Sequence, residues 1–70
     1  MKIRISAECI HRGKAIADTR HTASLDDTES DIVPAIGSIV MESISKARAQ
    51  RWYMNDPETW VRVEFREYHS

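Results

Sequence analysis

The side chains best suited to metal binding or nucleophilic chemistry are one cysteine and three histidines, Cys9, His11, His21 and His69. Side chains alternate along a strand, so Cys9 and His11 point to the same face of a strand that begins near residue 2. Zinc needs further ligands there, and a neighbouring strand supplies at most His21, so the sequence predicts no metal site. Cys9 falls among apolar positions, which is typical of an inert buried thiol.

Catalytic groups of other kinds are not favoured either. The paired carboxylates at Asp26 and Asp27, and at Glu64 and Glu67, lie in polar contexts that do not suit general acid–base catalysis. The two glycines are isolated, which excludes a Gly-rich phosphate loop. A small two-layer fold also leaves little room for a water-excluding pocket. We therefore expect a protein that is not an enzyme, without catalytic residues, cofactor or small-molecule substrate.

Hydrophobic periodicity indicates which elements position these residues. Apolar and polar residues alternate at both ends of the chain, and between them apolar residues recur at helical spacing. The alternating positions are Ile3, Ile5, Ala7 and Cys9, and Val61, Val63 and Phe65; the helical positions are Ile32, Val33, Ile36, Val40, Ile44 and Ala47. This change of period predicts two core strands and one amphipathic helix. Phe65 is expected in the core, where its truncation to alanine would cost about 3–5 kcal/mol.

The predicted elements are strands over 2–11, 15–22 and 59–68 and a helix from Asp31 to about Met54. A three-residue turn at 12–14 would pair Cys9 with Ala17 and Ile5 with His21, and it is favoured over a two-residue turn, which would put Arg20 opposite Ile5 on the buried side. Asp31 as N-cap places Pro34 in the first helical turn, where its missing N–H is harmless.

A right-handed crossover through the helix then makes the first strand central. The sequence therefore predicts an α+β fold and a single small domain over residues 1–70. Its architecture is a two-layer β-β-α-β domain: a three-stranded antiparallel sheet, order 2-1-3, with one long helix packed on one face.

Size and composition limit the function classes. A 70-residue chain buries only about 60% of its unfolded surface, so association with a partner would add useful stability. The hydrophobic fraction is 41%, yet no apolar run approaches the length of a membrane-spanning helix, so no membrane association is expected. One cysteine and no recognisable signal peptide predict a cytoplasmic protein.

Two groups of residues remain as candidate partner-binding surfaces. Ile10, Ile16 and Trp60 are predicted to meet on the open sheet face near the hairpin tip, and Met41, Arg48 and Trp52 on the outer face of the helix. Met, Arg and Trp are enriched at interface hot spots, and a cluster of exposed apolar side chains is unusual. The structural alternatives are that Trp60 folds over the sheet edge and that Trp52 turns inward at a frayed helix end.

These surfaces predict a small protein–protein interaction module, with an accessory, regulatory or inhibitor role, that self-associates as a homodimer. The alternative is a nucleic-acid-binding protein, in which an open sheet face with cations and aromatic rings, or the basic helix end, contacts the nucleic acid. The open-face residues of that alternative are Arg4, Arg62, Arg66 and Tyr68. Interleaved Glu8 and Glu64 and a net charge of −1 argue against it.

Overall fold

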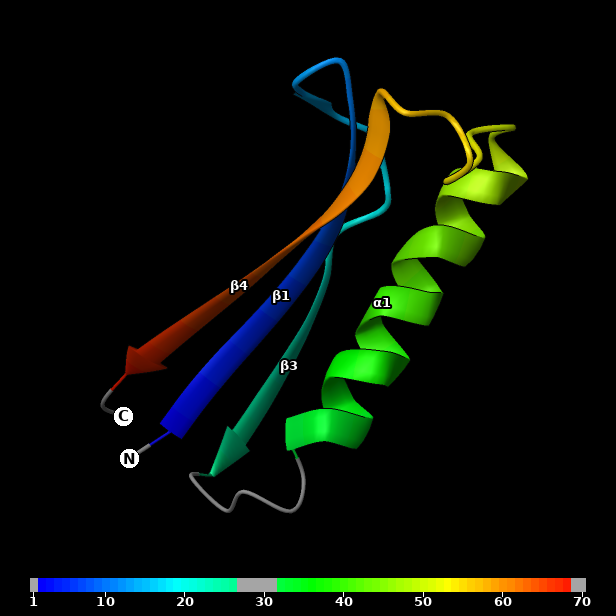
Figure 1. The fold of residues 1–70 in the computed structure, drawn as a ribbon. Coiled ribbons are helices and arrows are strands. Elements are labelled where there is room, and N and C mark those ends of the chain that lie inside the picture. Colours follow the sequence, from blue (N-terminus) through cyan, green and yellow to red (C-terminus); the bar gives the residue numbers. More distant parts are fainter. Residues whose placement is uncertain (1, 27–31, 69–70) are drawn as a thin grey trace.

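The computed structural model describes residues 2–26 and 32–68, and one helix lies on one face of an antiparallel sheet (Figure 1). The elements are β1 (Lys2–His11), β2 (Lys14–Ala15), β3 (His21–Asp26), α1 (Ile32–Ala49) and β4 (Thr59–Tyr68). The predicted two-layer α+β fold is therefore confirmed. Asp31 and His69, and the side chain of Tyr68, fall outside what the structure describes.

Strand β1 is the centre of the sheet, as predicted. Along one side it pairs with β4 over ten residues, from Lys2 opposite Tyr68 to His11 opposite Thr59. Along its other side it pairs first with β2 and then with β3. The predicted order, with the first strand between the second and the last, is thus present. The single second strand predicted over 15–22 is, however, replaced by two separate strands, β2 and β3.

The turn between β1 and β2 has two residues, not the three that were predicted. Arg12 and Gly13 have φ angles of 50° and 79°, and two positive values are typical of a type I′ hairpin turn. This turn places Ile10 opposite Ala15. The expected pairing of Cys9 with Ala17 is wrong, because the backbone N–H of Ile16 donates to the Cys9 carbonyl at 2.9 Å.

Residues 16–20 leave the sheet, and β3 resumes in a new register. Ala7 faces His21 and Ile5 faces Ala23, so the predicted pairing of Ile5 with His21 is also wrong. Because the chain inserts three residues between the two ladders, a small residue reaches the position opposite Ile5. The pairing then continues to Asp26, four residues beyond the predicted end of the second strand at Thr22.

Thr19 satisfies the backbone groups at this interruption. Its side chain is fully buried, and Oγ1 accepts a hydrogen bond from the Cys9 N–H at 3.1 Å. The same hydroxyl donates to the Ile16 carbonyl at 2.8 Å. One side chain therefore takes the place of a missing ladder partner, which allows the register to change without orphaned polar groups.

Helix α1 ends at Ala49, five residues before the predicted end. The Trp52 N–H donates to the Ala47 carbonyl at 3.0 Å, and the Arg51 N–H donates to the Arg48 carbonyl at 2.9 Å. Arg51 has a φ of 70°, so these two bonds form a Schellman motif with arginine at the usual glycine position. The motif turns the chain back toward the sheet at Trp52.

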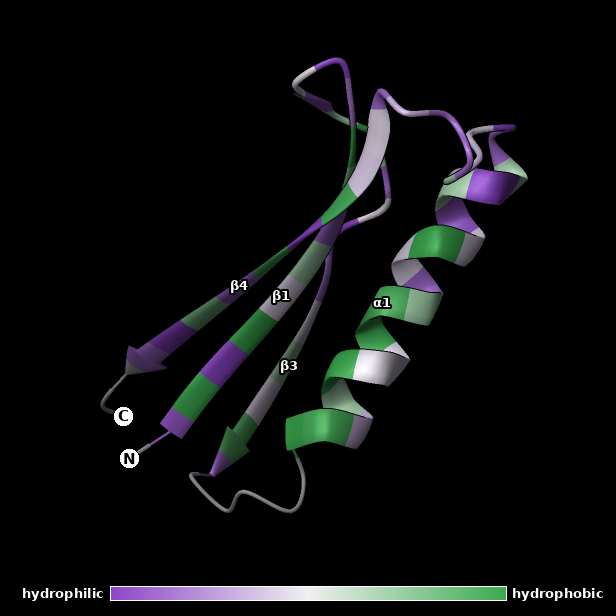
Figure 2. Ribbon diagram, in the orientation of Figure 1, coloured by the Kyte–Doolittle hydropathy of each residue, from purple (hydrophilic) through white to green (hydrophobic). Residues whose placement is uncertain are grey.

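The core lies between α1 and strands β1 and β3. Its fully or nearly buried members are Ile5, Ala7, Cys9, Ile39 and Ala47. The alternation of hydrophobic and hydrophilic residues along β1 is visible in Figure 2. On the helix, the positions that are most buried are Ile39, Ser43 and Ala47, whereas Val33 is 75% exposed. The predicted helical stripe is therefore wrong at Val33, because the helix is rotated toward Ile39.

We expect Thr19→Val to lower the free energy of unfolding by about 1–3 kcal/mol, because the Cys9 N–H and the Ile16 carbonyl lose their buried partner. Thr19→Ser keeps the hydroxyl and should lose much less. Urea denaturation followed by tryptophan fluorescence measures both variants, and equal losses would contradict the bridging role of the hydroxyl.

Arg51→Gly should raise the free energy of unfolding by about 1 kcal/mol, because glycine relieves the steric strain of a left-handed residue. Arg51→Ala removes the same side chain but keeps a Cβ atom, and is the matched control. Thermal denaturation should show a higher midpoint for the glycine variant alone. A gain of the same size in the alanine variant would assign the effect to the arginine side chain.

Candidate protein-binding surface

The predicted open-face patch of Ile10, Ile16 and Trp60 is not formed. Ile10 is 2% exposed and Ile16 is 7% exposed, so the expectation that both lie on the surface is wrong. The two-residue turn places Ile16 opposite Cys9, on the helix side of the sheet, where it packs in the core cluster with Cys9. Ile10 lies in register between Ala15 and Trp60, and only Trp60, 47% exposed, remains on the surface.

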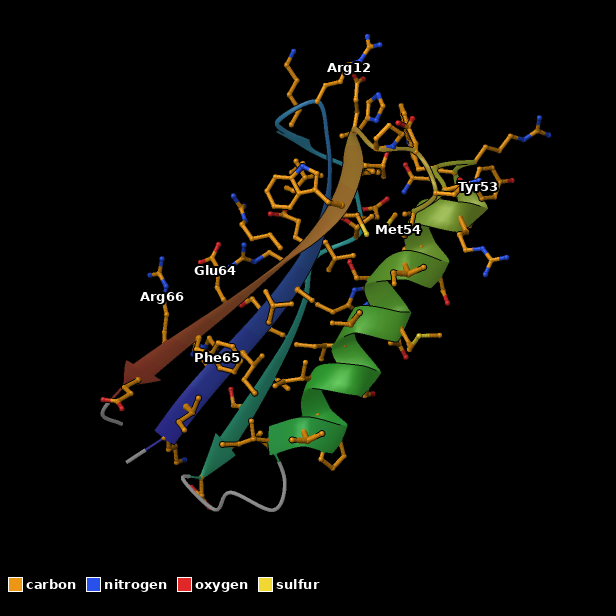
Figure 3. All side chains as sticks on the ribbon, viewed as in Figure 1. Arg12, Tyr53, Met54, Glu64, Phe65 and Arg66 are labelled. Carbon is orange, nitrogen blue, oxygen red and sulfur yellow. The ribbon has the colours of Figure 1, made fainter. Side chains whose placement is uncertain are left out.

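The predicted outer helix patch is also divided. Met41 is 61% exposed and Arg48 is exposed, so these two residues lie on the surface as expected. Trp52, however, lies beyond the helix, and its ring centroid is 4.3 Å from that of His11. The inward turn at the helix end, the alternative noted for Trp52, is therefore what the structure shows. Beside Arg48, a shallow cavity of about 330 Å³ is lined in part by Tyr53 and Met54 (Figure 3).

The chemically versatile side chains form two separate hydrogen bonds, one between sheet and helix and one between strands β1 and β4. A hydrogen bond of 3.3 Å joins Cys9 Sγ and Ser43 Oγ, both fully buried. His11 Nδ1 lies 2.8 Å from Thr59 Oγ1, which is also buried. Buried Ser43 and Thr59 gave no signal in the sequence, because a lone hydroxyl residue fits equally well on a surface. These side chains are satisfied by one another, as structural polar groups in an interior are.

Within residues 2–26 and 32–68, no three His, Cys, Asp or Glu side chains gather in a way that could hold a metal ion. In the same residues no helix has the length and apolar character needed to span a membrane.

Phe65 is the strand residue that departs from the predicted core. It is 56% exposed, although it faces the fully buried Ile5 across the β1–β4 pair. Helix α1 packs mainly on β1 and β3, and β4 forms the far edge of the sheet (Figure 1). A helix is about 10 Å wide and strands are about 4.8 Å apart, so one helix covers about two strands. The helix-side face of β4 is therefore left partly open.

We call Val61, Val63 and Phe65 the β4 apolar strip. The three residues alternate along β4 and share its helix-side face. Val61 and Val63 are half-buried against the core, and Phe65 extends the strip into solvent. The strip is continuous with the core on one side and open on the other.

The opposite face of β4 carries paired charges. Arg62 Nη2 lies 2.8 Å from Glu8 Oε1, and Arg62 Nε lies 3.1 Å from Glu64 Oε1. Arg66 Nη2 lies 3.8 Å from Glu64 Oε2. Figure 3 shows Glu64 and Arg66 projecting from β4 away from α1. Arg62 and Glu8 face one another across the β1–β4 pair and form a cross-strand ion pair.

The outer edge of β4 presents backbone groups at every second residue. The Arg12 N–H donates to the Glu58 carbonyl at 3.1 Å, which extends the β1–β4 ladder by one pair. Because hydrogen-bonded pairs alternate in an antiparallel ladder, the backbone N–H and C=O groups of the even-numbered residues of β4 point toward β1. The backbone groups of the odd-numbered residues point outward from the edge of the sheet. In the part of the chain that the structure describes, no strand pairs with this edge. Strand β4 contains no proline or lysine, two residues that commonly protect an edge, although it carries the charged residues Arg62, Glu64, Arg66 and Glu67.

Comparison with known protein families, with curated proteins and with solved structures found no match to this chain. The functional argument therefore depends on the edge strand β4, with its apolar strip and Trp60.

We expect Phe65→Ser to change the free energy of unfolding of the monomer by less than about 1 kcal/mol, because most of the ring is already in water. Ile5→Ala, on the neighbouring strand, removes a fully buried side chain and should cost about 2–5 kcal/mol. Urea denaturation at low protein concentration distinguishes the two. Equal losses would show that Phe65 is part of the core.

Proposed function

We propose that this protein is a non-enzymatic protein–protein interaction module that binds through β4. The observation that carries the proposal is the exposure of Phe65, 56%, on a strand whose outer backbone edge has no pairing strand among the described residues. An exposed apolar edge strand is a template for pairing with another chain. Trp60, 47% exposed on the other face of β4, adds a second large side chain to this surface.

The energetic reason for binding is the small size of the domain. Burying a large apolar side chain contributes about 1.5–3 kcal/mol, and anything that binds only the folded state adds to its stability. A marginally stable 70-residue chain therefore gains from a partner that covers Phe65 and Trp60. An accessory, regulatory or inhibitor role suits such a module, and a cytoplasmic location suits its single, free and buried cysteine.

Nucleic-acid binding has weaker support. Arg62 is engaged by both Glu8 and Glu64, and Arg66 by Glu64. A phosphate on this face would meet the two carboxylates at the same place, and the net charge of the chain is −1. The carboxylates beside Arg62 and Arg66 therefore weaken the attraction of these two arginines for phosphate.

Affinity capture from the proteins of the native host tests the proposed surface. Wild type should retain a protein, either a second copy or another chain, that is lost when Phe65→Ser is the bait. Met41→Ser is the control, because it removes an apolar side chain that is 61% exposed on the outer face of α1, and it should retain the same protein. Equal retention by wild type and Phe65→Ser would contradict the proposed role of β4.

A gel-shift assay against single-stranded and double-stranded nucleic acid distinguishes the two functions. We expect only weak binding that disappears as salt is raised to physiological concentration, because Arg62 and Arg66 already pair with glutamates and the net charge of the chain is −1. Sub-micromolar binding at physiological salt, weakened by Arg62→Ala or Arg66→Ala, would replace the protein-binding proposal with nucleic-acid binding.

A further inference from the structure

We propose that the protein-binding partner of β4 is a second copy of this chain, paired antiparallel strand to strand about a two-fold axis at Val63. This inference rests on the proposed function and identifies its partner. It is carried by three properties of β4: its free backbone edge, the order of its charges, and its apolar strip.

The backbone edge is long enough for a stable ladder. Strand β4 has ten residues, which span about 33 Å when extended, and the whole molecule is 37 Å long. Its outward N–H and C=O groups belong to the odd-numbered residues, so two copies of the edge offer the same alternation of donors and acceptors. A two-fold axis at an odd-numbered residue lets each copy donate and accept equally.

The charges and the apolar strip together select which residue lies on the axis. With Val63 on the axis, Arg62 of each copy faces Glu64 of the other copy, so both cross-axis pairs join opposite charges. With Glu64 on the axis, two Glu64 carboxylates meet and Arg62 faces Arg66. With Phe65 on the axis, Glu64 faces Arg66 and the charges also match, but Val63 faces Glu67 and the two apolar strips meet only at Phe65.

The apolar side chains agree with the same register. The two-fold axis of an antiparallel edge-to-edge pair runs perpendicular to the sheet, so both copies present α1 on the same side. Phe65 of each copy then faces Val61 of the other copy, and the two β4 apolar strips become one. On the opposite face Trp60 meets Arg66 of the second copy, a pair that can stack as cation and ring.

Cross-linking through Val63→Cys tests the axis directly. A hydrogen-bonded antiparallel pair has a Cα–Cα separation of about 5.5 Å, which is within the range of a disulfide. Mild oxidation should therefore convert most of this variant to a covalent dimer. Wild type should remain uncross-linked, because its Cys9 is fully buried.

Glu67→Cys is the matched control on the same strand and the same face. Its thiols would be about 27 Å apart in the proposed dimer, because the two residues are eight positions apart along the joined strands. This variant should stay monomeric under the oxidation that links Val63→Cys. Equal cross-linking of the two variants would indicate random collision and overturn the proposed register.

Light scattering after size exclusion gives an independent measurement on the reduced protein. Wild type should elute as a dimer at tens of micromolar, and Phe65→Lys should shift it to monomer, because a charge enters the joined apolar strips. Met41→Lys makes the same change on the outer face of α1 and should leave the dimer intact. Dissociation by Met41→Lys alone would instead assign the interface to the helix.

Wild type that is monomeric at millimolar concentration would overturn the second-copy proposal. The capture experiment then judges the proposed function separately. A different protein that is retained by wild type and lost with Phe65→Ser would preserve the protein-binding function with another partner. No such protein would overturn both.

Discussion

The width of one helix relative to the sheet is the constraint on which the other features of this protein depend. Helix α1 covers β1 and β3, where the deepest side chains, Ile5 and Ala7, are completely buried. It cannot also cover β4, because two strand spacings already match its diameter. Strand β4 therefore has the alternating apolar residues of a core strand, but the side chain of Phe65 is largely exposed to water.

The position of the helix over β3 depends in turn on the interruption between β2 and β3. The type I′ turn places Ile16 on the helix side, and Thr19 then closes the gap by bonding to both Cys9 and Ile16. Gln50 Nε2 donates to the Ala17 carbonyl at 2.6 Å, so the end of the helix is held against the same loop. The interruption thus aligns β3 under α1 and binds the C-terminal end of α1 to the sheet.

The buried polar side chains form hydrogen bonds that stabilise the fold, so the argument for a function concerns the surface of the protein. Cys9 pairs with Ser43 of the helix, and His11 of β1 pairs with Thr59 of β4. On the open face, Arg62 and Arg66 are paired with Glu8 and Glu64. Val33 and Met41 on α1 are also exposed, but only β4 combines exposed apolar side chains, Phe65 and Trp60, with an outer backbone edge that no strand pairs with among the described residues.

Local patterns in the sequence were sufficient to predict the element types, the central place of β1 and the outward position of Met41, because alternation and helical spacing are short-range properties of a chain.

The tertiary structure alone decided the register, the end of the helix and the extent of the core. Ile16 changed faces because a turn of two residues, not three, reverses the parity of the next strand. The helix ended early because Arg51 adopts a left-handed conformation. Glycine at this position would have indicated the helix end in the sequence, whereas arginine does not. Phe65 has the parity of a core residue, but burial also requires an element that covers it. Coverage depends on where α1 lies across the sheet, which is a property of the assembled fold and not of any local pattern.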